Sequence, residues 1–209
     1  MPRVSPLMPS KLAKCAFELF SLRGIGEVTI DDIAARAEVT KGSFYSHYSS
    51  KQEVIYAACD HYYCTYLEAV QSELSKLKDP GQRLAHVLEY SVRSCVVDRG
   101  NRVFTTEIFT LLQKDQRMRE DWAEFYDTVR EMYLDLLVAA QKEVNSEAAD
   151  PRQAVDLMLT AMEGIKMRAS FEPEIEEPQQ QRGMVEGLWK ILFGSSVELC
   201  GTRINHEGV

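Results

Sequence analysis

The chain has 209 residues, of which 45% are apolar and 27% charged, with a formal net charge of −8. This composition predicts a globular protein with a packed core and excludes an intrinsically disordered chain. No apolar run is long enough to span a membrane, and the first residues lack the features of a secretory signal, so we expect a cytoplasmic protein without membrane association. Residues 1–52 hold seven Lys/Arg against five Asp/Glu. Any affinity for a polyanion therefore belongs to this N-terminal segment.

The first fifty residues contain three short helical patterns. Apolar residues three and four apart predict a first helix that ends at Gly24. Thr29, followed three residues later by Asp32, is typical of the start of a second helix. A third pattern resumes around Phe44 and is too short to be stable without packing on its neighbours.

The rest of the chain predicts longer helices. Their apolar faces place them at 51–78, 80–97, 103–113, 122–140, 151–170 and about 181–197, with a loop at 98–101 and an exposed connection at 171–181. Asp150 followed by Pro151 is typical of a capped helix start. No alternating strand pattern or internal repeat is apparent. The predicted fold class is therefore all-α, with about nine helices.

The second and third patterns have the form of a helix-turn-helix, in which the second helix enters the major groove of DNA. Hydroxyl groups and lysines around the turn can contact phosphates, and a glycine leaves room for the backbone to approach the duplex. These residues are Thr29, Thr40, Lys41, Gly42, Ser43, Tyr45 and Lys51. Each of them alone is better explained as an ordinary cap or core residue. Their combination favours a DNA-binding module.

The run from Ala16 through Val54 resembles the N-terminal DNA-binding domain of the TetR family of bacterial transcriptional regulators. It contains T-x-x-D-I-A-x-x-A-x-V for the second helix and turn, then K-G-x-F-Y-x-H-Y-x-S-K-x-E for the recognition helix and the start of the fourth. The resemblance implies a helix-turn-helix domain at 1–50 and a ligand-binding and dimerisation domain at 51–209. It also implies a homodimer that represses from a palindromic double-stranded DNA operator and is released by an unidentified small-molecule effector.

The resemblance also assigns roles by position. Thr29, Tyr45 and Lys51 are expected to contact phosphates, and the residues expected to reach base edges are Thr40, Lys41, Gly42 and Ser43. His47 is either a phosphate contact or a packing residue. Phe44 and Tyr48 are expected to face the core of the module itself.

The body of the chain is rich in aromatic residues, which line effector cavities when a few polar groups converge on them. The predicted effector contacts are Tyr62, Tyr66, Tyr90, Phe104, Phe109, Trp122 and Tyr126. Aromatic residues at this spacing are also typical of a plain helical core. The acidic residues Glu89, Glu107 and Asp127 either favour a cationic ligand or form a solvated face.

In the resembling family the last two helices form the dimer interface, whose predicted core is Ala154, Leu157, Met158, Ala161, Leu188, Leu192 and Phe193.

Other classes of function receive less support. No catalytic or cofactor-binding signature accompanies the four histidines, so we expect neither an enzyme nor a bound cofactor. His61 and Cys64 lie three apart on one helix, but a metal-sensing site would need further ligands. We therefore expect no metal site. Five cysteines without a C-x-x-C pair indicate reduced, mostly structural thiols. A helical small-molecule carrier remains an alternative that the basic N-terminal segment disfavours.

Overall fold

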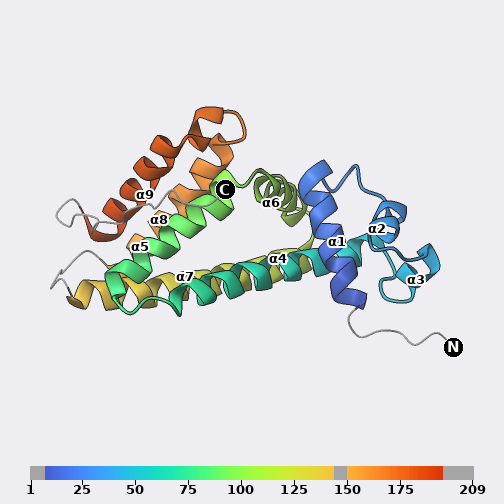
Figure 1. The fold of residues 1–209 in the computed structure, drawn as a ribbon, viewed down its shortest axis with the longest axis horizontal. Coiled ribbons are helices and arrows are strands. Elements are labelled where there is room, and N and C mark those ends of the chain that lie inside the picture. Colours follow the sequence, from blue (N-terminus) through green and yellow to red (C-terminus); the bar gives the residue numbers. More distant parts are fainter. Residues whose placement is uncertain (1–7, 144–149, 195–209) are drawn as a thin grey trace. The chain divides into compact units, whose positions relative to one another are not determined.

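The computed structural model describes residues 8–143 and 150–194, and within them the chain is helical without strands (Figure 1). This confirms the predicted all-α fold with about nine helices. The helices are α1 (Met8–Arg23), α2 (Ile30–Arg36), α3 (Lys41–Tyr45), α4 (Lys51–Leu74), α5 (Pro80–Ser91), α6 (Arg99–Leu112), α7 (Gln116–Glu143), α8 (Pro151–Arg168) and α9 (Pro178–Phe193). A π-helical segment η1 (Val92–Val97) follows α5, and a 3₁₀ turn η2 (Pro173–Glu176) precedes α9.

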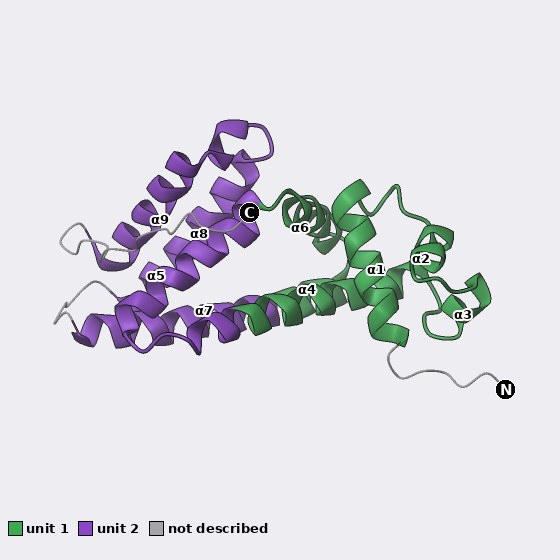
Figure 2. Ribbon diagram, viewed as in Figure 1, with its two compact units in different colours: residues 1–69, 98–122 green, residues 70–97, 123–209 purple. Residues whose placement is uncertain are grey.

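The chain divides into two compact units, shown in green and purple in Figure 2. The first comprises residues 1–69 and 98–122, and the second comprises residues 70–97 and 123–209. The division by contacts thus falls within α4 and α7. The domain boundary predicted between residues 50 and 51 separates a DNA-binding part from a ligand-binding part rather than two sets of contacts, and it stays a prediction.

In the first unit, α1 packs on α2 and α6, and α2 packs on α3. The helix α1 ends because Gly24 adopts φ +86°, a conformation that glycine reaches without steric cost. Leu12, Phe20, Ile33 and Phe44 are fully buried and form the core of the N-terminal module. The short helix α3 is therefore held by packing, as its length requires.

In the second unit, α8 packs along α9, and α9 also contacts α5 and η1. Asp79 caps α5 and Asp150 caps α8, each followed by proline in the first helical turn. The start predicted for α8 is thereby confirmed. The rings of Trp189 and Phe193 stack with their centroids 4.4 Å apart, on the buried side of α9.

Two predicted connections are wrong in detail. The segment 98–101 is not a loop, because the side chain of Asp98 accepts the N–H of Asn101 and starts α6 at Arg99. The segment 171–181 contains the turn η2, and α9 begins at Pro178. The C-terminal end predicted for this helix and the last cysteine, Cys200, lie outside the described residues. None of the described helices has the length and apolar character needed to cross a membrane.

Candidate functional site

The turn between α2 and α3 is fixed by backbone hydrogen bonds and by one cap. The N–H of Val39 donates to the Ala34 carbonyl at 2.9 Å, and Glu38 adopts φ +58° to allow this reversal. At the start of α3, the Thr40 hydroxyl oxygen accepts the N–H of Ser43 at 3.1 Å. This contact uses a lone pair of the Thr40 oxygen and does not consume its hydrogen, which can still be donated to a phosphate.

A capping box fixes the start of α2. The Thr29 hydroxyl oxygen accepts the N–H of Asp32 at 3.1 Å, and the Asp32 carboxylate accepts both the N–H and the O–H of Thr29. Hydrogen bonds from Thr29, together with Arg23, lower the pKa of Asp32 to about 2. The Thr29 hydroxyl, predicted to contact phosphate, therefore donates within the module itself.

Lys41 and Tyr45 lie on the exposed side of α3, four residues apart. The Lys41 ammonium pairs with the carboxylate of Asp31, at 2.9 and 3.0 Å from its two oxygens, and this contact raises the pKa of Lys41. The Tyr45 side chain is 48% exposed and its ring packs edge-on against Phe44. A lysine and an aromatic hydroxyl are thus presented to solvent by a helix whose other side is buried.

Gly42 follows Lys41 on the same helix. Its φ is not positive, and a Cβ atom built there would meet only the Thr40 hydroxyl, at an ordinary 3.8 Å. The described part of the chain therefore has no steric need for glycine at this position. If another molecule approaches the backbone closely here, that approach would explain why a glycine occupies the position.

Lys51 is engaged inside the first unit. Its ammonium donates to the Ile25 carbonyl at 2.5 Å, and the N–H of Ile25 donates to the Glu107 carboxylate at 2.5 Å. A Cβ atom on Gly24 would lie 2.3 Å from that carboxylate and would displace the Glu107 side chain, and the positive φ of Gly24 itself favours glycine. The loop before α2 is held by α4 and α6 through the backbone carbonyl and N–H of a single residue, Ile25.

The remaining predicted residues of the module divide between core and surface. Phe44 is fully buried, and the partly buried Tyr48 donates its hydroxyl hydrogen to the Pro9 carbonyl at 3.0 Å, so both face the interior of the module, as expected. His47 and Ser43 are partly exposed. Asp31 was not singled out by sequence reasoning. The only signal in the sequence was a second acidic residue in the first turn of α2, beside the capping Asp32.

Five of the predicted effector contacts lie in the first unit, and most pack against other rings. Phe104 contacts Phe17 and Tyr62 at centroid distances of 5.0 and 5.9 Å, and Trp122 contacts Phe109 and Tyr63 at 5.3 and 5.6 Å. Tyr62, Tyr66, Phe104 and Trp122 are buried. These residues contribute to an aromatic core, and their contact with an effector stays a prediction.

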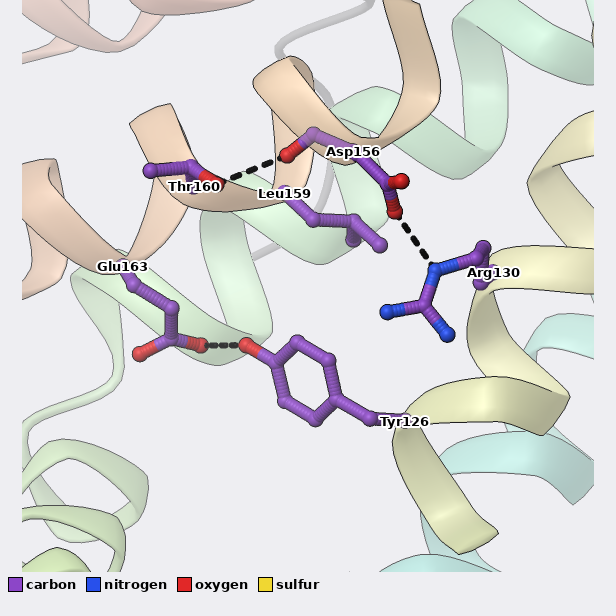
Figure 3. A pocket seen from close by; sticks show the side chains of 6 residues that line it. All are labelled: Tyr126, Arg130, Asp156, Leu159, Thr160 and Glu163. Atoms are coloured by element: carbon purple, nitrogen blue, oxygen red, sulfur yellow. Dashed lines mark hydrogen bonds and ion pairs between the residues drawn. The ribbon is translucent and has the colours of Figure 1, made fainter. Parts of the chain in front are cut away.

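The other two, Tyr90 and Tyr126, lie in the second unit. The guanidinium of Arg93 lies 5.8 Å from the centroid of the Tyr90 ring. Tyr126 lines a hollow of about 430 Å³ between α7 and α8 (Figure 3), together with Arg130, Asp156, Leu159, Thr160 and Glu163. The Tyr126 hydroxyl donates to Glu163, and burial followed by this carboxylate raises the pKa of Tyr126.

Ionic contacts surround this hollow. Arg130 pairs with Asp156 at 2.5 Å and with Asp127, while Lys166 pairs with Glu163 at 2.5 Å and is itself buried. The hollow itself is lined by one cationic side chain, Arg130, and two acidic ones, Asp156 and Glu163. Of the acidic residues predicted to favour a cation, Asp127 pairs with Arg130, which lines this hollow, whereas Glu107 is engaged in the first unit.

The predicted dimer residues are not equally accessible. Met158, Leu188, Leu192 and Phe193 are buried in the subunit's own core, as is Ala154. Leu157 is 57% exposed and Ala161 is partly exposed. Helical spacing alone does not tell which apolar residues pack inside a subunit and which face outward.

The His61 ring packs edge-on against Phe17 with centroids 5.6 Å apart, and Cys64 is exposed. Among the described residues, no three His, Cys, Asp or Glu side chains come together as a possible metal site.

Two family models match the chain. Residues 13–58 match the model described as bacterial regulatory proteins of the tetR family, and residues 80–191, more than half of the chain, match the C-terminal model of BetI-type transcriptional repressors. The chain belongs to the TetR family. Its resemblance to the family is confirmed, and the first matched region contains α2, α3 and the exposed residues of α3. TetR-family proteins are transcriptional regulators rather than enzymes.

Similar proteins agree with this assignment. The A-factor receptor protein of Streptomyces griseus is 24% identical over 199 residues, which are 95% of this chain and 64% of the receptor. The regulator YerO of Bacillus subtilis is 29% identical over 75 residues, 36% of this chain and 24% of YerO. The chain thus spans less than two thirds of these relatives. A Saccharomonospora viridis transcriptional regulator crystallised with choline shares the fold, with a TM-score of 0.77 at 16% identity over 90% of this chain and 96% of that one.

Proposed function

We propose that this TetR-family protein is a homodimeric repressor, that α3 of each subunit enters a major groove of a palindromic operator, and that a small-molecule effector releases it. One observation carries the DNA-binding part: α3 exposes Lys41 and Tyr45 on a buried scaffold, around a glycine that the described chain does not need. A helix with these side chains can contact phosphates and base edges, and Gly42 permits a close approach. The match to BetI-type repressors supports repression.

The residues proposed to contact DNA differ in role. Thr40, Lys41, Gly42 and Ser43 begin α3 and are proposed to face base edges. Tyr45 is proposed to contact phosphate, and His47 stays a candidate for the same role. Thr29 and Lys51 already make contacts inside the module, so we propose that they act chiefly by fixing α2 and α4 for binding.

A homodimer through α8 and α9 is supported by the exposed side of these two helices. Leu157 and Met167 of α8 are 57% and 58% exposed, and Phe171, which follows the end of α8, is 68% exposed. In the same two helices, a Cβ built on Gly164 of α8, or on Gly183 or Gly187 of α9, would meet no described atom within 4 Å other than those of its own stretch of helix. Glycine within a helix costs roughly 1 kcal/mol relative to alanine. Helices of a second subunit packed closely against this face would offset that cost.

The dimer proposal is tested by replacing Leu157 with Asp. We expect Leu157→Asp to sediment as a monomer at concentrations where the unmodified protein is a dimer, because the carboxylate would be buried in the interface. Leu22→Asp is the matched control, since Leu22 is 68% exposed on α1 in the first unit. Dimers of Leu157→Asp as stable as the unmodified protein would contradict this interface.

The effector is proposed to bind in the C-terminal part of the chain, where the residues that line the hollow beside Tyr126 would make its polar contacts. An aromatic ring and a surplus of one acidic side chain favour a small organic cation. The choline complex of the S. viridis regulator makes choline the first compound to test. Release of bound DNA by choline, weakened in Tyr126→Ala, would support this site. Release that is equally strong in Tyr126→Ala would place the effector elsewhere.

DNA binding is tested by selecting duplexes from a random-sequence library with the purified protein. We expect an inverted repeat with half-sites centred about 34–36 Å apart, or a multiple of that distance. Enrichment of no sequence would contradict the proposed function.

A further inference from the structure

The ion pair between Lys41 and Asp31 joins the two helices of the DNA-binding module. The Lys41 ammonium lies 2.9 and 3.0 Å from the two Asp31 oxygens, so it bridges the carboxylate. The side chains are 55% and 64% exposed. Lys41 is the first residue of α3, and Asp31 lies in the first turn of α2.

Stability does not explain this pair. Ion pairs between side chains this exposed contribute little to folding, because water and salt screen them. The start of α2 does not need Asp31, since Asp32 and Thr29 already form its capping box. An acidic side chain beside the lysine of a DNA-contacting helix also repels phosphates. Asp31 is therefore expected to lower the affinity for DNA in general, and better discrimination among sequences would offset that loss.

We propose that Asp31 is a specificity-determining residue, which holds the Lys41 ammonium away from phosphates and directs it to a base edge. This inference rests on the proposed DNA-binding function. An unrestrained lysine is a flexible point charge that binds any phosphate equally well. While Asp31 neutralises it, Lys41 adds little to the attraction that all sequences share. The ammonium still has hydrogens to donate to the O6 and N7 acceptors of a guanine in the major groove.

The test compares Asp31→Asn with the unmodified protein on the duplex selected from the random library and on a scrambled duplex, at several salt concentrations. Freed from Asp31, Lys41 becomes one more phosphate contact. We expect the affinity for the scrambled duplex to rise by about tenfold and the plot of log affinity against log salt to steepen by about 0.9. The affinity for the selected duplex rises less, so the ratio between the two duplexes falls.

Two further variants separate this role from a general charge effect. In the Lys41→Ala background, Asp31→Asn should no longer steepen the salt dependence, because the change acts through Lys41. Glu38→Gln also removes one negative charge from the module, but Glu38 lies in the turn between α2 and α3 and does not pair with Lys41. It should therefore leave the ratio of the affinities for the selected and the scrambled duplex unchanged.

The outcomes separate this inference from the proposed function. Equal changes for both duplexes, or the same steepening in the Lys41→Ala background, would overturn the role of Asp31 while DNA binding stands. If the unmodified protein selects no duplex, both the proposed function and this inference are overturned.

Discussion

The Lys51 ammonium donates to the backbone carbonyl of Ile25 at 2.5 Å. The same peptide segment is held from the other side, because the Ile25 N–H donates to Glu107 of α6. A lysine that the family pattern assigns to phosphate binding thus connects the start of α4 with the loop that precedes α2. Replacing Lys51 should therefore lower the stability of the fold more directly than it weakens contact with DNA.

We therefore predict that Lys51→Met lowers the free energy of unfolding by about 1–3 kcal/mol, because a hydrogen bond from a charged donor is lost. Urea denaturation followed by circular dichroism measures this. Lys41→Met is the matched control, since its exposed ion pair contributes little to stability. Unchanged stability of Lys51→Met would show that the contact with Ile25 is dispensable and leave phosphate binding as its main role.

Gly42 gives the sharpest separation between folding and binding. Gly42→Ala should leave stability unchanged or raise it by up to about 1 kcal/mol, because alanine favours helix and the new methyl group meets only Thr40 at 3.8 Å. The same change should weaken binding to the selected duplex by about tenfold or more, by removing contacts made at close approach. Gly26→Ala is the control, because a Cβ there meets no described atom within 4 Å. Full DNA affinity in Gly42→Ala would contradict a close approach at this position.

Glu38 is the only described non-glycine residue with positive φ, at 58°. The left-handed conformation costs an L-residue about 1–2 kcal/mol, whereas glycine adopts it freely. Part of this gain is lost because glycine also makes the unfolded chain more flexible. Glu38→Gly should therefore raise the free energy of unfolding by up to about 1 kcal/mol. Glu38→Ala keeps the Cβ atom and should give no such gain. Equal stabilisation by both variants would point to the charge of Glu38 instead of its backbone.

The capping box of α2 predicts a pH dependence. The folded-state pKa of Asp32 is about 2, below its ordinary value of 3.8, so the folded state favours the ionised carboxylate. Its contribution to stability is therefore fully present above pH 3.8 and is lost as the pH falls from 3.8 towards 2. The difference in urea midpoint between the unmodified protein and Asp32→Asn should shrink over this window. A difference that does not change with pH would show that the charge of Asp32 is not what stabilises the cap.

Local signals in the sequence predicted much of this fold. Thr29 with Asp32, and Asp150 with Pro151, define helix starts through contacts between near neighbours, and such contacts can be read from spacing. The start of α6 at Arg99 was missed because the cap, Asp98, lies in a segment that also contains glycine and asparagine, which are typical of a loop.

Contacts between distant residues could not be predicted in the same way. Ile25 and Glu107 are 82 residues apart, and no local pattern indicates that they meet. Apolar spacing identified α8 and α9 but did not reveal that Met158 is buried in the subunit while Leu157 is exposed. The Lys41–Asp31 pair also depends on how two helices pack, which the sequence motif leaves unstated.

The central claim is that the first residues of α3 from both subunits face base edges in the major groove. Methylation protection of guanine N7 on the selected duplex tests it most directly, because this atom is exposed only in the major groove. We predict that guanine N7 atoms are protected in two stretches of the duplex about one helical turn apart. In Lys41→Ala, one guanine in each stretch should lose this protection, and the two guanines should be related by the symmetry of the duplex. Binding without protection of any guanine N7, or protection identical in Lys41→Ala, would contradict the assignment of α3 and Lys41 to base recognition.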